Sequence, residues 1–253
     1  MTLIVQVSDT HFDNSPATAQ RNARVWDYLE ALPFDPELVL HTGDVTDHGL
    51  SNEYREAARR VAGRHRVAAI PGNHDRRTDF AEGLPGVTAD SDPAGPLDLA
   101  VELAELTVIA LDSTVPSADG ERIDHGHLAE SSLIWLDRQL AARPAGRTAL
   151  VALHHPPVAL GHPTMDAIRL DNPDDLADVL NAHRDIAGIV CGHAHTATAA
   201  TFAGLPVRIA PGVASTITLE GEPGELLNRD LPPGFAFHEV RPDGTLITQF
   251  RHL

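Results

Sequence analysis

The stretch Leu38-Val39-Leu40-His41-Thr42-Gly43-Asp44 decides the fold class. Its apolar run stops at a glycine and then presents a carboxylate, which is typical of a buried strand that carries an acid at its carboxyl end. In open α/β sheets, ligands bind at that end of the strands. The stretch therefore predicts an α/β fold with Asp44 in a site at a strand end.

Four other segments repeat this pattern, and each apolar run ends in side chains of metal-ligating types. Their tips are Asp9-Thr10-His11, Gly72-Asn73-His74-Asp75, His154-His155 and Gly192-His193-Ala194-His195. Any one tip alone is more often a turn, a helix cap or a surface pair. Five strand tips that all carry Asp, Asn or His are hard to explain by turn chemistry. We therefore expect them to converge on one metal site with Asp44 at its centre.

Not every histidine is expected to bind metal. Adjacent side chains of an extended segment point to opposite sides, so only one of His154 and His155 should face the metals. Cys191 is expected to be a small buried side chain rather than a ligand. The remaining histidines are expected to be exposed or to lie behind the ligands: His41, His48, His65, His125, His127, His162, His183, His238 and His252.

Length and composition narrow the classes of protein. The 253 residues suffice for a single domain over residues 1–253. A net charge of -17 argues against a nucleic-acid or anionic-membrane surface. The one cysteine, Cys191, cannot form an internal disulfide, and no apolar run approaches the roughly 20 residues of a membrane span. A cytoplasmic location is the expectation.

The order of the predicted elements indicates parallel βαβ units, with two sheets and helices outside them. Besides the five strands before the tips, strands are predicted over residues 97–103 and 106–111, as an antiparallel pair, and over 198–203, 207–210, 235–241 and 246–250. Helices are predicted over residues 17–32, 51–63, 131–142 and 174–182. The first is expected to bury Val25, Tyr28, Leu29 and Leu32. The third is expected to bury Leu133, Trp135, Leu136 and Leu140. Irregular loops are predicted over 79–95, 112–130, 155–173 and 221–233.

The ligand types narrow the metal. Aspartate, asparagine and histidine without thiolate suit Mn, Fe, Zn or Co. The ligands at the tips are too many for one tetrahedral site, whereas two adjacent ions that share Asp44 as a bridge would use them all. Two ions about 3.5 to 4 Å apart can activate a bridging water and stabilise displacement at phosphorus. The residues therefore predict hydrolysis of a phosphoester.

The five motifs, in this order, resemble those of the calcineurin-like metallophosphoesterases. Within that family, Leu111-Asp112-Ser113 with Val115-Pro116 and the short C-terminal strands resemble the bacterial class III cyclic nucleotide phosphodiesterases. The resemblance implies a four-layer αββα sandwich of two mixed sheets, with the metals between the strand tips. No residue of the family's motifs is missing, which implies an active enzyme.

The resemblance also implies a role for each motif residue. One ion would be held by Asp9, His11, Asp44 and His195, and the other by Asp44, Asn73, His154 and His193. Asn73 and His74 would contact the substrate phosphate. His74 would protonate the leaving alkoxide, and Asp75 would orient His74.

The expected function is a dinuclear metal phosphodiesterase that cleaves a small phosphodiester by attack of a metal-bridging hydroxide. The first candidates are 3',5'-cyclic AMP and GMP. The alternatives are a 2',3'-cyclic nucleotide or glycerophosphodiester hydrolase and a protein phosphatase. A non-catalytic scaffold has no need for the full ligand set with His74, and this argues against it. The expected partner is a small-molecule substrate, with neither nucleic acid nor membrane, and a homodimer stays open.

Overall fold

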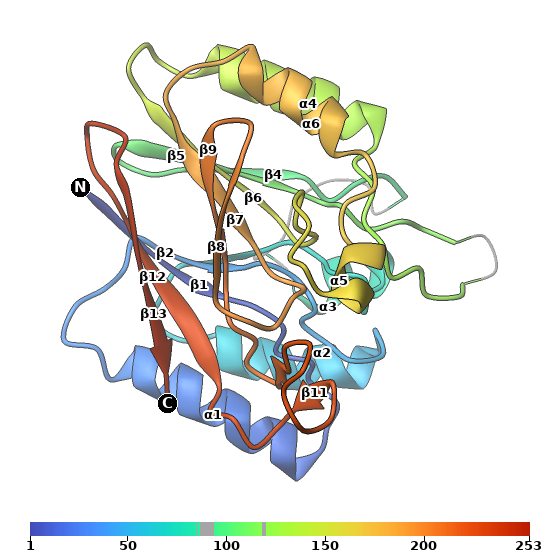
Figure 1. Ribbon diagram of the computed structural model, residues 1–253. Coiled ribbons are helices and arrows are strands. Elements are labelled where there is room, and N and C mark those ends of the chain that lie inside the picture. The colour runs from blue at the N-terminus through green and yellow to red at the C-terminus, as the bar shows by residue number, and fades with distance from the viewer. Residues whose placement is uncertain (85, 87–93, 118–119) are drawn as a thin grey trace.

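Two mixed sheets form the centre of the molecule in the computed structural model, which describes residues 1–84, 86, 94–117 and 120–253 (Figure 1). The first sheet has the strand order β13-β12-β1-β2-β3. Strands β1, β2 and β3 run parallel, whereas β12 and β13 are antiparallel to their neighbours. The bounds are β1 Thr2–Val7, β2 Leu38–His41, β3 Val67–Ala69, β12 Gly234–Val240 and β13 Leu246–His252.

The second sheet has the strand order β4-β5-β6-β7-β9-β8. Strands β5, β6, β7 and β9 are parallel, and the edge strands β4 and β8 are antiparallel to them. The antiparallel pairing predicted for β4 with β5 is confirmed. The bounds are β4 Leu99–Glu102, β5 Leu106–Leu111, β6 Thr148–Leu153, β7 Ile186–Cys191, β8 Thr198–Phe202 and β9 Leu205–Ile209.

Helices cover the outer face of each sheet. In Figure 1, α1 (Pro16–Glu30) and α2 (Ser51–Val61) lie below the sheets, and α4 (Glu130–Ala142) and α6 (Pro173–Asn181) lie above them. The apolar core correspondingly has three parts, one under each helical layer and one between the sheets. The middle part is built from alternate side chains of the central strands, including Leu40, Ala110 and Ala152. The predicted four-layer αββα sandwich is confirmed.

The first helix shows how sequence sets an element's bounds. Ser15 caps its start by accepting a hydrogen bond from the Thr18 amide, and Pro16 follows in the first turn. The helix buries Val25, Trp26 and Leu29 against the first sheet. The prediction that Tyr28 lies on the buried face was wrong, because its side chain is 37% exposed while Trp26 takes the inner position.

Three of the predicted loops contain short regular elements. Helix α3 (Arg77–Gly83) overlaps the loop predicted over 79–95, and its Phe80 is fully buried; residues 85 and 87–93 lie outside the described part. Helix α5 (Pro163–Ala167) lies within 155–173. Strand β11 (Leu227–Asn228) lies within 221–233 and pairs with β10 (Thr216–Ile217). Such short elements depend on tertiary contacts, so local sequence pattern predicts them poorly.

The loop predicted over 112–130 is irregular in its described residues, apart from a single bridge between Gly126 and Leu170 and the first residue of α4. Residues 118 and 119 of this loop lie outside the described part. Among the helices described, none is both long and apolar enough to cross a membrane.

Candidate metal centre

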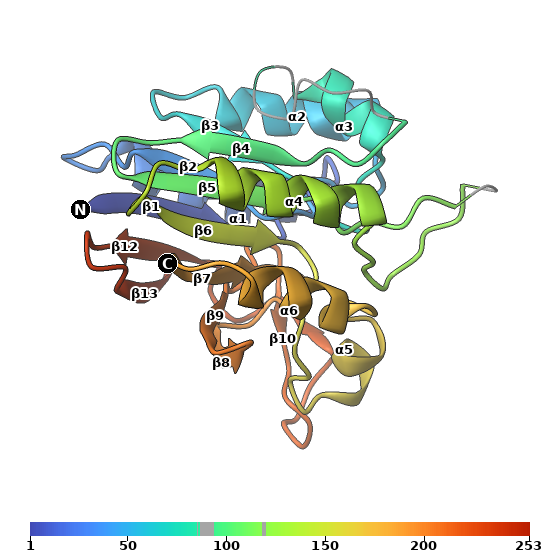
Figure 2. The ribbon, with the colours of Figure 1, turned by 90° about the horizontal axis from the view of Figure 1, so that it is seen from above.

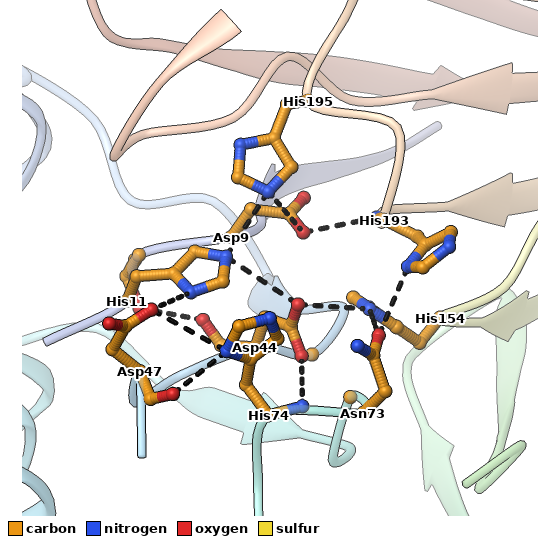
Figure 3. A network of polar contacts seen from close by, with 12 residues as sticks. Asp9, His11, Asp44, Asp47, Asn73, His74, His154, His193 and His195 are labelled. Atoms are coloured by element: carbon orange, nitrogen blue, oxygen red, sulfur yellow. Dashed lines mark hydrogen bonds and ion pairs between the residues drawn. The ribbon is translucent and has the colours of Figure 1, made fainter. Parts of the chain in front are cut away.

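The five strand tips meet at one edge of the sandwich, between the two sheets (Figure 3). Strands β1, β2 and β3 of the first sheet lead to Asp9 with His11, to Asp44 and to Asn73. Strands β6 and β7 of the second sheet lead to His154 and to His193 with His195. The structure thus brings together all seven residues predicted as ligands, and the site exists only where the sheets pack on each other.

Backbone strain is concentrated in these tips. Non-glycine residues rarely adopt positive φ, at a cost of order 1–3 kcal/mol each. Five of the predicted ligands do so: Asp9 (φ 55°), His11 (41°), Asp44 (53°), His193 (68°) and His195 (50°). The surrounding structure must hold these residues in place, as is common at functional sites. The strain turns their side chains inward at the point where each strand stops.

Glycines before the ligands allow the tips to approach closely. A Cβ atom at Gly72 would overlap the Asp44 carboxylate and backbone and would lie 2.7 Å from Nε2 of His154. Gly43 has φ +100°, and a Cβ there would overlap the His154 ring. A side chain at either position would therefore clash with the neighbouring tip. At Gly43 the positive φ also favours glycine.

One group of ligand atoms comprises Asp9, His11, Asp44 and His195, whose atoms lie within 4.8 Å of one another. The Nε2 atoms of His11 and His195 are 3.1 Å apart. Their Nδ1 atoms are held from behind, by Asp47 Oδ1 at 2.9 Å for His11 and by Ser215 Oγ at 2.9 Å for His195. Both rings therefore direct Nε2 into the group, as metal-binding histidines do.

The second group comprises Asp44, Asn73, His154 and His193. Asn73 Oδ1 lies 3.2 Å from His154 Nε2 and 3.1 Å from His193 Nδ1. His154 Nδ1 donates to the carbonyl of Thr42 at 2.7 Å, which directs Nε2 toward Asn73. Asp44 Oδ2 lies 3.4 Å from His154 Nε2 and 3.5 Å from His11 Nε2, so this one oxygen faces both groups.

The family model described as calcineurin-like phosphoesterase matches residues 2–197. The chain belongs to the calcineurin-like phosphoesterase family. The family prediction made from the five motifs is thereby confirmed.

Relatives and solved structures agree with this membership. The chain is 35% identical to a probable cyclic nucleotide phosphodiesterase of Rhodococcus erythropolis, over 90% of this chain and 76% of that protein. It is 32% identical to a probable glycerophosphodiester phosphodiesterase of Arcobacter nitrofigilis, over 76% of this chain and 71% of that protein. A dimetal phosphatase from Danio rerio shares the fold, with a TM-score of 0.73 at 15% identity, over 99% of this chain and 96% of that chain. The predicted metal-dependent phosphoesterase class is thus confirmed for this calcineurin-like chain.

The residues of the calcineurin-like site fit a pair of metal ions. Asp9 Oδ1 lies 3.5 Å from His195 Nε2, and His193 Nδ1 lies 3.1 Å from Asn73 Oδ1, so both residues direct a donor atom toward the other ligands. Carboxylate, amide and imidazole donors together suit Mn, Fe, Zn or Co.

Burial makes the charges of the site interdependent. Burial raises the pKa of Asp9 to about 6, with His154 opposing this rise and Asp44 adding to it. Burial also opposes ionisation of Asp44, but His154 and His74 hold its pKa well below the usual value. Burial lowers the pKa of His193. Burial also disfavours the charged ring of His154, but Asp44 outweighs this and raises the pKa of His154 to about 9, so metal binding there would release a proton.

His74 lies beside the ligands without joining either group of four. Its amide donates to Asp44 Oδ1 at 2.9 Å, and its ring Nδ1 donates to the Asp47 carbonyl at 2.8 Å. Its ring meets that of His11 edge-on, with centroids 4.5 Å apart. Nη1 of Arg122 is 3.0 Å from Nε2 of His74. The ring is thus fixed by Asp47 with Nε2 near a cation on the 112–130 loop.

Asp75 takes a different place from the one expected. Its carboxylate accepts hydrogen bonds from the amides of Val45, Thr46 and Gly72, at 3.0 to 3.1 Å, and from the Tyr54 hydroxyl at 2.9 Å. It therefore ties the Asp44 tip to the Asn73 tip. The ring of His74 is held by Asp47, which takes the orienting role expected of Asp75.

Asp47 and Ser215 are the supporting residues that the sequence analysis missed. The sequence analysis gave Asp47 no role, although its position three residues after Asp44 could have suggested a place in the site. Ser215 follows β9 in a segment without a metal-binding pattern, and the sequence offers no signal for it.

The ring of His155, next to His154, contacts residues of the 112–130 loop. Its Nδ1 is 2.8 Å from Ser113 Oγ, and its Nε2 is 3.2 Å from the Asp124 carbonyl. Its ring packs on His193 with centroids 4.6 Å apart, so its nitrogens also come within 4.8 Å of those of His154 and His193. Because both its nitrogens have protein partners, His155 supports His193, and His154 faces the centre.

Proposed function

We propose that this protein is a dinuclear metal-dependent phosphodiesterase that hydrolyses 3',5'-cyclic nucleotides, with cAMP and cGMP as the first candidates. The observation that carries the proposal is the position of Asp44 Oδ2, within 3.5 Å of nitrogen atoms from both ligand groups. A carboxylate shared in this way is suited to bridge two ions. The relative from Rhodococcus, named a probable cyclic nucleotide phosphodiesterase, supports the choice of substrate.

The assignment of ligands follows the two groups. Asp9, His11, Asp44 and His195 would hold one ion, and Asp44, Asn73, His154 and His193 the other. A bound pair of ions supplies Lewis acidity and an activated water at phosphorus. Asp47, Ser215 and the Thr42 carbonyl fix the ring orientations, which limits the reorganisation needed when the ions bind.

His74 is proposed to donate a proton to the leaving alkoxide. Its Nδ1 is engaged by the Asp47 carbonyl, so Nε2 is the atom that can reach a substrate. Burial disfavours the charged ring, but Asp44 and Asp47 outweigh this and raise the pKa of His74 to about 9. A protonated imidazole there would both attract a phosphate and supply the proton. Asn73, which lines the same cleft, would contact the phosphate with its amide.

A glycerophosphodiester is the second candidate substrate, because the relative from Arcobacter is named a probable glycerophosphodiester phosphodiesterase. A panel of diesters tests the choice: 3',5'-cAMP, 3',5'-cGMP, 2',3'-cAMP and glycerophosphoethanolamine with the Mn-loaded protein. The proposal expects the highest kcat/KM for a 3',5'-cyclic nucleotide. A higher kcat/KM for glycerophosphoethanolamine would favour the glycerophosphodiester over the cyclic nucleotide as the substrate. Hydrolysis of phosphomonoesters alone would contradict both candidate substrates.

Several broader features complete the proposal. Residues 1–253 act as one domain, since both sheets contribute to one site. The partner is a small molecule rather than a nucleic acid, because the net charge is -17. A cytoplasmic location fits the single buried thiol of Cys191. Whether two copies form a homodimer is a question for light scattering in solution.

A further inference from the structure

The cleft over the metal centre has one wall that phosphoester chemistry does not use. Its lining includes His11, Asp44, Asn73, His74 and the two histidines after β7. The aliphatic wall of the cleft is the apolar part of this lining, and it comes from two segments far apart in the sequence. Its side chains are Met165, Ile168, Ile217, Leu226 and Leu227.

These two segments lie next to each other in the fold. Figures 1 and 2 both place α5 near the β10–β11 hairpin. Met165 is in α5 and Ile168 follows it, while Ile217 is in β10 and Leu227 in β11. The aliphatic wall is therefore a joint surface of α5 and the hairpin.

The hairpin is fixed to the metal centre. The amide of Ala214 donates to the Asp9 carbonyl at 2.9 Å, and Ser215 Oγ contacts His195 Nδ1 at 2.9 Å. Strand β10 starts at the next residue. Arg21 holds both ends of the segment, through the carbonyls of Val213 at 2.8 Å and Arg229 at 2.7 Å. The wall thus keeps its position relative to any phosphate bound over the metals.

The leucines of the hairpin are unusually exposed for their size. Leu226 and Leu227 are 43% and 44% exposed and line the cleft. Apolar surface that faces a cleft is stabilised when an apolar ligand group displaces its water. The cleft has a volume of about 230 Å³, which is below the roughly 300–1,000 Å³ typical of drug-sized ligand sites, so it suits a small group.

We propose that Met165, Ile168, Ile217, Leu226 and Leu227 form an aliphatic clamp for the base of a nucleotide whose phosphate lies over the metal centre. This inference rests on the proposed function, and it names the base as the part of the substrate that the enzyme recognises. A base has apolar faces for the clamp and a polar edge, and Thr164 and Arg229 of the same cleft offer polar groups to that edge. A glycerol or ethanolamine group would leave the aliphatic wall in water.

Binding of products tests the clamp apart from catalysis. AMP and ribose 5-phosphate share the phosphate and ribose, and only AMP carries a base. Calorimetry on the Mn-loaded protein is expected to give a Kd for AMP at least about tenfold lower than for ribose 5-phosphate, as burial of a base against several aliphatic side chains implies. The double variant Leu226→Ser with Leu227→Ser should reduce this ratio to below about threefold.

Two controls separate the clamp from general damage. Leu231→Ser alters a leucine that is 44% exposed, close in the chain and absent from the lining of this cleft, and it should leave the ratio unchanged. Leu226→Met with Leu227→Met keeps an apolar surface and should retain most of the AMP preference. Equal binding of AMP and ribose 5-phosphate to the unmodified protein, or an unchanged ratio in the serine double variant, would overturn the clamp.

The clamp and the proposed function can fail separately. If the unmodified protein hydrolyses 3',5'-cAMP but shows no base-dependent binding, the clamp is wrong and the function stands. If it shows leucine-dependent preference for AMP but hydrolyses no 3',5'-cyclic nucleotide, the clamp stands and the proposed substrate is wrong.

Discussion

Oδ2 of Asp44 lies 3.4 Å from Nε2 of His154, although the two residues follow strands of different sheets. Asp44 follows β2 of the first sheet, and His154 follows β6 of the second. The metal centre is therefore assembled by the packing of one sheet on the other. Changes that loosen this packing should affect metal binding as well as stability.

Gln6 tests how strongly polar contacts between the two sheets stabilise the fold. Its buried side chain donates to Thr42 Oγ1 and to the Cys191 carbonyl, both at 2.8 Å, and contacts His238 Nε2 at 2.8 Å. Gln6→Leu leaves these buried groups unpaired, so we expect a loss of about 2–5 kcal/mol in the free energy of unfolding. Urea denaturation measures it. Gln249→Leu, at an exposed position on β13, should change stability by less than about 0.5 kcal/mol.

His74→Ala tests the assignment of the general acid. The variant should keep both metal ions, because His74 belongs to neither ligand group of four. Its rate should fall by about 10²- to 10⁴-fold for a ribose leaving group and much less for p-nitrophenolate, which needs no proton. Equal losses for the two leaving groups would argue against the role. His252→Ala, an exposed histidine near the C-terminus, serves as the control.

Asp47→Ala tests the support of the first ligand group. The change removes the carboxylate that fixes His11 through Nδ1 at 2.9 Å. Loss of such an orienting partner typically weakens metal affinity by about 10- to 100-fold. Competition with a chelator measures this loss, and Asp47→Asn should recover part of it because an acceptor oxygen remains. Unchanged affinity in both variants would show that His11 needs no such support.

Gly72→Ala tests the close approach of the tips. Its Cβ would displace the Asp44 carboxylate, so the variant should lose metal and activity together. Gly146→Ala is the matched control: its φ of +79° strains the chain, but no atom lies within 4 Å of the added Cβ. We expect the control to lose about 1 kcal/mol of stability and to keep its metals. Metal analysis of both purified variants measures the difference. Full metal content in Gly72→Ala would contradict the claim that a Cβ at this position displaces Asp44.

The sequence predicts the strand tips well because each tip is a local pattern. An apolar run, a glycine and a polar ligand occur within a few residues at Asp44 and at His193, and burial on both faces makes the runs continuous. The element order indicated two sheets with helices outside them, the family resemblance implied the four-layer sandwich, and the structure confirms both. The convergence of the tips could be inferred because parallel strands end at the same edge.

The remaining features depend on contacts that local patterns do not encode. The bond from Asp47 to His11, and the ties from Asp75 to Val45 and Gly72, join separate tips. Strands β10 and β11 have two residues each, and their position is set by anchors such as Arg21. The aliphatic wall likewise appears only when residues 163–168 and 216–228 meet in the fold.

The number of metal ions bound by Asp44→Ala is the most direct test of the shared carboxylate. Metal analysis of the Mn-reconstituted protein should give two ions per chain for the unmodified protein. For Asp44→Ala we expect fewer than one ion per chain, with no measurable hydrolysis of bis-p-nitrophenyl phosphate. Two tightly bound ions with retained turnover in this variant would contradict the account.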